Sequence, residues 1–73
     1  MNKTVEIDIT SISDDEAMDL DFEISNHLID LNVRHSVASL GAKLVFMLDD
    51  IDIIIYNIFI NHLKNKNLLF QEV

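Results

Sequence analysis

The stretch SDDEAMDLDFEISNHLIDLNV, residues 13–33, decides the fold because its apolar residues fit either a helix or a strand. Ser13 and Glu16 have the spacing of a capping box, in which each side chain accepts a hydrogen bond from the other residue's backbone N–H. Asn32 suits the left-handed residue that follows a helix, with Val33 as its apolar contact. We therefore predict a helix from Ser13 to about Leu31. Its inward stripe recurs every three or four residues and comprises Ala17, Leu20, Ile24, Leu28 and Leu31.

A strand is the competing interpretation of the same stretch. Met18 to Ser25 alternates strictly between apolar and polar residues, which is the period of a half-buried strand. Such a strand would pair with the preceding strand around an acidic turn. We favour the helix because the capping box and the long stripe agree with each other. The fold and the proposed binding face both depend on this choice.

Strand-like segments lie on both sides of this helix. Lys3 to Ile9 alternates between apolar and polar residues, with Val5, Ile7 and Ile9 directed inward. From Arg34 to Leu48, two β-type runs flank the only glycine of the chain, Gly41, which suits the positive φ of a hairpin turn. The second run is apolar at its centre and predicts a central strand.

A second helix and a final strand complete the pattern. Asp49 or Asp50 is the expected N-cap, and the helix runs to about Lys66. Asn67 repeats the role of Asn32, and residues 68–73 form the last strand. The order β-α-β-β-α-β predicts an α+β, ferredoxin-like fold, with two helices on one face of a four-stranded antiparallel sheet. Residues 1–73 make one domain.

The composition is that of a folded chain without covalent cross-links. Apolar residues make up 49% of the 73 residues, and there is no proline or cysteine. The lack of cysteine excludes disulfides and thiolate metal sites, and fits the reducing cytoplasm. The N-terminus is unlike a secretory signal, and the longest apolar stretch, Ile53–Ile60, is far shorter than the ~20 residues of a membrane span. We expect a cytoplasmic protein that does not enter a membrane.

The excess negative charge lies entirely in the first half of the chain. The formal net charge is −8; residues 1–33 hold nine acids against Lys3, and residues 34–73 hold four acids against four bases. An acidic surface disfavours direct binding of nucleic acid, which requires a basic face. It attracts a basic protein partner. An acidic face that only keeps the protein soluble explains the same charge.

The predicted second helix is apolar nearly all round. One broad face comprises Ile51, Ile54, Ile55, Ile58 and Phe59. A second face comprises Ile53, Tyr56, Ile60 and Leu63. One sheet does not cover both faces of such a helix. We expect the second face to form a homo-oligomer interface, because small domains often complete their cores by association.

The first helix carries a second apolar stripe beside its acids. Met18, Phe22 and Ile29 form this stripe, and an apolar patch of that kind typically marks an interface. The outward carboxylates next to it are those of Glu16, Asp19, Glu23 and Asp30. We expect the seven residues together to bind a partner, unless the two helices pack tightly and bury both stripes.

No arrangement of residues indicates an enzyme or a cofactor. His27 and Asp30 are three residues apart on a helix, but no established metal-ligand spacing includes them or His62. His35 and Ser36 are neighbours on a strand, so their side chains point to opposite faces. One glycine does not build a phosphate-binding loop. We expect no catalytic residue, no metal and no cofactor.

Two functions fit these features. The first is a small acidic inhibitor or adaptor of the phage type, which docks on a basic, possibly nucleic-acid-binding, host protein through the first helix. The second is a structural or regulatory homo-oligomer that uses the apolar flank of the second helix. A small-ligand sensor is a third, more distant option, for which no ligand is indicated.

Overall fold

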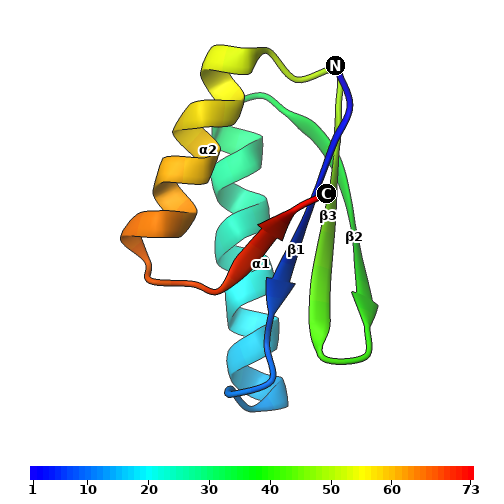
Figure 1. Cartoon of the computed structure of the whole chain (residues 1–73), viewed down its shortest axis with the longest axis vertical. Coiled ribbons are helices and arrows are strands. Elements are labelled where there is room, and N and C mark those ends of the chain that lie inside the picture. The colour runs from blue at the N-terminus through cyan, green and yellow to red at the C-terminus, as the bar shows by residue number, and fades with distance from the viewer.

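The computed structural model describes all 73 residues and confirms the predicted α+β, ferredoxin-like order. The antiparallel sheet has the strand order β2-β3-β1-β4, and both helices lie on one face of it (Figure 1). The elements are β1 (Lys3–Asp8), α1 (Asp14–Asp30), β2 (Arg34–Leu40), β3 (Lys43–Asp49), α2 (Ile53–Asn65) and β4 (Phe70–Glu72).

Local hydrogen bonds fix both ends of α1. The Glu16 N–H donates to Ser13 Oγ, and the Ser13 N–H donates to Glu16 Oε1, each at 3.2 Å, so the predicted capping box is present. At the other end Asn32 has φ 60°, and the Val33 N–H donates to the Leu28 carbonyl at 2.9 Å. This bond closes a Schellman motif. The strand interpretation of residues 18–25 is therefore wrong.

The α2 helix begins later than predicted and ends as predicted. Asp52 is the N-cap, because its Oδ1 accepts the Ile54 N–H at 2.7 Å. The predicted caps are wrong, because Asp49 still belongs to β3 and Asp50 turns the chain with φ 48°. Asn67 ends the helix with φ 58°, as Asn32 does for α1.

The β2–β3 hairpin sets the register of the sheet. Gly41 has φ 60° at the first position of a two-residue turn, which places Leu40 opposite Lys43 and Val37 opposite Phe46. β3 is a central strand, as predicted, and β4 is shorter than predicted. The difference arises because Leu68 donates its N–H to the Leu63 carbonyl and so still belongs to the end of α2.

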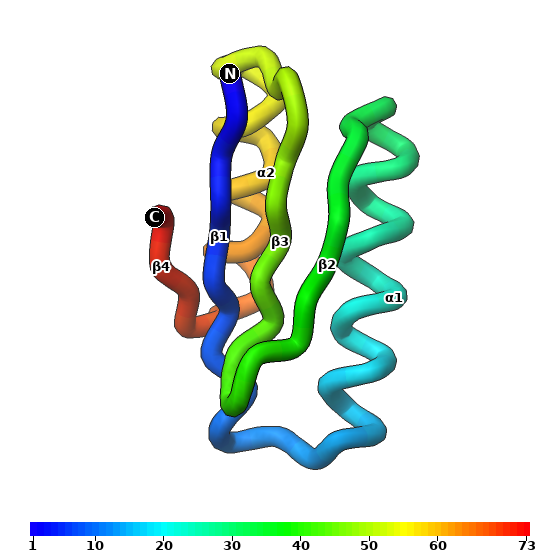
Figure 2. The backbone as a smooth tube through the Cα atoms, turned by 90° about the vertical axis from the view of Figure 1, so that its right-hand side faces the viewer, coloured from blue at the N-terminus to red at the C-terminus, as the bar shows by residue number.

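The core lies between the sheet and the helices. Phe46 of β3 and Phe59 of α2 are its largest fully buried side chains. α2 lies behind the middle of the sheet, whereas α1 lies beside β2 and extends past that edge (Figure 2). Neither helix combines the length and apolarity that a membrane-crossing helix requires.

Three of the four residues of the predicted oligomer face on α2 point into the core of the domain. Tyr56, Ile60 and Leu63 are buried in the core, and only Ile53 is exposed. Phe59, which belongs to the other predicted face, is part of the same core cluster. The side of α2 that the sheet covers therefore contains residues of both predicted faces. The exposed apolar residues of α2 are Ile53, Ile54 and Ile58, next to asparagines.

Candidate protein-binding surface

Three large apolar side chains of α1 are exposed to solvent. Met18 is 62% exposed, Phe22 67% and Ile29 61%. Their spacing of four and seven residues places them on one side of the helix. We call Met18, Phe22 and Ile29 the α1 flank.

The α1 flank faces away from α2, and at its C-terminal end it comes close to the start of β2. On the opposite side of α1, His27 stacks on His62 of α2, so that side is turned toward the second helix. The α1 helix itself lies outside β2 (Figure 2). Ile29 also shares a shallow hollow with Arg34, the first residue of β2.

The four predicted carboxylates of α1 are all exposed, but two are already engaged. Glu16 is part of the capping box, and Glu23 forms an ion pair with Lys66 just after α2. Asp19 and Asp30 make no ion pair or side-chain hydrogen bond. The seven predicted residues thus all lie on one helix. The four acids lie along one side of the α1 flank and do not surround it.

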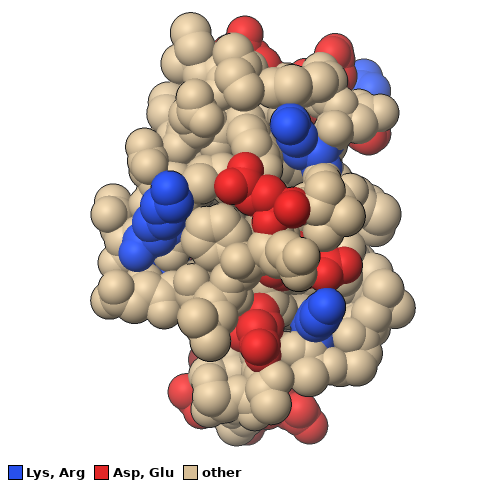
Figure 3. Space-filling model, viewed as in Figure 1, with Lys and Arg blue, Asp and Glu red and all other residues tan.

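The charges are distributed unevenly over the surface. On the face shown in Figure 3, acidic and basic side chains alternate over the sheet, whereas only acidic ones are visible at the lower end, where α1 begins. The first turn of α1 contains Asp14, Asp15 and Glu16. A basic partner would therefore be attracted to the side of the molecule that carries α1.

The sheet has one long open edge, which the sequence pattern did not single out. β2 and β4 are the edge strands; β2 has seven residues and β4 has three. Strand order results from long-range pairing, so no local motif marks β2 as an edge strand. The hairpin spacing indicates only that β2 pairs with β3.

Two histidines meet between the helices. The rings of His27 and His62 stack with centroids 3.8 Å apart and an interplanar angle of 12°. Each Nε2 is buried without a hydrogen-bond partner. The pKa of His27 is lowered, mainly by burial. The neighbouring His62 and Lys66 lower it further, and Asp30 opposes the shift. The sequence placed these histidines on different helices and gave no sign of their contact.

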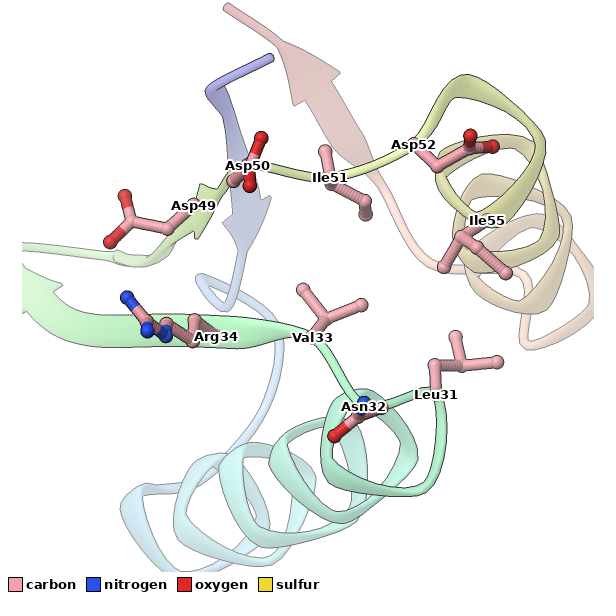
Figure 4. A pocket seen from close by; sticks show the side chains of 9 residues that line it. All are labelled: Leu31, Asn32, Val33, Arg34, Asp49, Asp50, Ile51, Asp52 and Ile55. Atoms are coloured by element: carbon pink, nitrogen blue, oxygen red, sulfur yellow. The ribbon is translucent and has the colours of Figure 1, made fainter.

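The largest hollow lies at the end of the molecule where β3 leads into α2. Its volume is about 320 Å³, and four aliphatic side chains converge on it, those of Leu31, Val33, Ile51 and Ile55 (Figure 4). The side chains of Asp49, Asp50 and Asp52 point away from this space, and Asp52 is committed to its helix cap. No acid–base pair is directed into the hollow (Figure 4).

The remaining polar residues form no recognisable reaction centre. His35 Nδ1 lies 3.2 Å from the Val33 carbonyl oxygen, and Ser36 belongs to the other face of β2. No group of three or more histidine and carboxylate side chains is placed to hold a metal ion. Comparison with known proteins assigns no family, because no family model, curated protein or solved structure matches this chain significantly.

Proposed function

We propose that this chain is a protein-binding module without catalytic activity, and that the exposed surface of α1 docks on a basic protein. The observation that carries the proposal is the α1 flank, whose three large apolar side chains are all more than 60% exposed. A folded domain seldom leaves three such side chains together in water unless they form an interface.

The energetics of the flank support binding. Burying a Met, Phe or Ile side chain that was exposed is worth about 1.5–3 kcal/mol each. The free carboxylates of Asp19 and Asp30 add attraction to Lys or Arg on the partner, mainly by speeding its approach. An inhibitor that covers the basic surface of a nucleic-acid-binding protein would use both contributions.

Capture from a lysate of the source cells, with matched variants, tests this proposal. Asp19→Lys together with Asp30→Lys should abolish capture of the partner, and so should Phe22→Ser. Asp49→Lys is the control for a charge reversal, since Asp49 lies on β3 outside α1. A partner that is retained equally by all variants, or the lack of any partner, would refute docking through α1.

A homo-oligomer is the second candidate function, and the exposed side of α2 favours it. Ile54 is 67% exposed and Ile58 44%, one turn apart. Light scattering on the purified protein, with Ile58→Asp as the interface variant, tests this alternative. A concentration-dependent dimer that Ile58→Asp returns to monomer would support it, and a monomer at all concentrations would exclude it.

A further inference from the structure

The free edge of β2 has backbone hydrogen-bonding groups available. In an antiparallel ladder, hydrogen-bonded and non-bonded residue pairs alternate. A two-residue hairpin makes the pair next to the turn a bonded one, which here is Leu40 and Lys43. Counting back along β2, the N–H and C=O groups of His35, Val37 and Ser39 therefore face the open edge.

This edge lacks the features that normally prevent another strand from pairing with it. Proteins protect edges by shortness, proline, bulges or charged side chains. β4 is protected in this way, because it has three residues and contains Glu72. β2 has seven residues with unbroken register to β3, and its single charged residue, Arg34, stands at its first position.

The side of α1 next to this edge provides contacts for an added strand. Met18, Phe22, Asp21 and Ser25 line a hollow of about 210 Å³ on α1. Ile29 and Arg34 line another of about 190 Å³, where α1 meets β2. A strand added to β2 would run along both hollows, with every second side chain directed toward α1.

The charges on α1 indicate which side chains the added strand carries. Asp21 lies on the same side of α1 as Met18 and Phe22, and only one of its carboxylate oxygens accepts the Ser25 hydroxyl, at 3.0 Å. Asp14 lies one turn before Met18. Long basic side chains fit here, because their methylene stems cover the α1 flank while their charged ends reach the carboxylates. Phe22 offers a ring face to the same cations.

A second copy of the chain fits this edge poorly. Since α1 extends past β2 (Figure 2), a copy paired edge to edge would bring its own α1 against the first one. The α1 helices of the two copies would collide, and both carry an excess of acids. Steric overlap and charge repulsion therefore oppose this pairing.

We propose that the open edge of β2 receives an extended segment of the partner as a fifth strand, in which Lys or Arg alternates with apolar residues. The basic side chains face α1, and the apolar ones lie over the outer face of the sheet beside Ala38 and Leu40. This inference rests on the proposed function and specifies how the basic partner is held.

Amide hydrogen exchange on the ¹⁵N-labelled protein tests the inference. The probe is a capped peptide of seven residues, Arg-Val-Arg-Val-Arg-Val-Arg, which matches the seven residues of β2. A block peptide with four arginines followed by three valines has the same charge and composition. At about ten times its Kd, the alternating peptide should slow exchange about tenfold at His35, Val37 and Ser39. The block peptide should not.

A variant pair links the effect to α1. Replacing Met18 and Phe22 by serine should weaken binding of the alternating peptide, whereas Ile54→Ser on α2 should leave it unchanged. Both changes are at exposed positions, so the fold is kept. Equal weakening by the two changes would refute the side of α1 next to β2 as the site.

The remaining outcomes separate this inference from the proposed function. Both peptides could instead change the amide chemical shifts of Asp19 and Asp30 without protecting the β2 edge from exchange. That result would overturn strand addition and leave docking on the acidic helix in place. No binding of either peptide at about 1 mM, a free energy of about −4 kcal/mol, would overturn the inference. The proposed function would then be decided by the capture experiment. Protection of the edge in a peptide-free dimer would show that the occupant is a second copy.

Discussion

The contact of His27 with His62 predicts that the packing of the two helices depends on pH. The rings stack between α1 and α2, and the neighbouring charges are those of Asp30, Lys66 and the Glu23 that pairs with Lys66. Desolvation and a second imidazole both disfavour a proton on His27, and this lowers its pKa below the ordinary 6.5. A residue that appears unimportant in the sequence therefore affects how the helix layer is held together.

The sign of the pH dependence follows from this lowered pKa. As pH falls below about 6.5, the unfolded chain takes up a proton on His27 before the folded protein does. The free energy of unfolding should therefore decrease between pH 7.5 and pH 5.5, above the range in which carboxylates titrate. Urea denaturation at both pH values measures it. His27→Gln should reduce the decrease and His35→Gln should not; equal pH dependence in both variants would contradict the assignment.

Tyr56 shows how one hydroxyl connects α2 to the end of the sheet. Its hydroxyl donates a hydrogen bond of 2.7 Å to Glu72 Oε1, and burial together with this carboxylate raises its pKa. The ring is buried and lies under Lys3, whose Nζ is 5.2 Å from the ring centroid. Tyr56 thus links α2, β1 and β4.

Tyr56→Phe removes the hydroxyl and keeps the ring. Because Glu72 is exposed and water replaces the lost donor, the free energy of unfolding should fall by only about 1 kcal/mol. Equilibrium denaturation measures this loss. The double variant Tyr56→Phe with Glu72→Gln should lose little more than the single one, and additive losses would show that the two groups are not coupled.

At the scale of the helix, local signals determine where α1 begins and ends. Ser13→Ala removes the acceptor for the Glu16 N–H, and capping substitutions of this kind cost about 1 kcal/mol. Thermal denaturation should show a lower midpoint for this variant. Ser39→Ala, at an exposed position on β2, is the matched control and should change the midpoint little. Equal midpoints for Ser13→Ala and the wild type would mean that the capping box does not stabilise α1.

Element positions could be predicted from the sequence wherever short-range chemistry sets them. The capping box, Gly41 and the asparagines at positions 32 and 67 all act within a few residues, and all were found in the predicted roles. The start of α2 was missed because distant residues set it. Ile51 donates its N–H to the Met1 carbonyl at 2.8 Å, and Asp50 donates its N–H to Asn2 Oδ1 at 3.0 Å. These contacts hold the chain in the sheet layer past Asp49, and no local pattern contains them.

At the scale of the molecule, the two apolar faces of α2 could be predicted from the sequence, but not which of them the sheet would cover. That choice depends on how the two helices pack. They run antiparallel, with His27 beside His62 and, one turn away, Glu23 paired with Lys66 (Figure 1). This register turns Tyr56 and Leu63 onto the sheet. The α1 flank was identifiable in advance, because an acidic, well-capped helix has only one stripe available for the core.

The concentration of charge on one helix predicts an effect of salt on stability. Net charge is −8, and only three ion pairs hold any of the acids, each of them at least partly exposed. Exposed pairs contribute little, so salt should act mainly by screening repulsion among the unpaired acids of α1. The midpoint of thermal denaturation should therefore rise with NaCl between about 0.01 M and about 0.5 M, where the Debye length shortens from ~30 Å to a few ångströms.

Neutral variants show whether α1 is the source of this repulsion. Asp19→Asn with Asp30→Asn should raise the midpoint at low salt and flatten its dependence on NaCl, since both carboxylates lack a partner. Asp49→Asn is the control, because Asp49 lies on β3 outside α1, opposite Arg34 in the β2–β3 ladder. If Asp49→Asn flattened the salt dependence as much as the double variant, the repulsion would belong to the whole molecule. There would then be no reason to single out the acidic side of α1 as the part of the surface that attracts a basic partner.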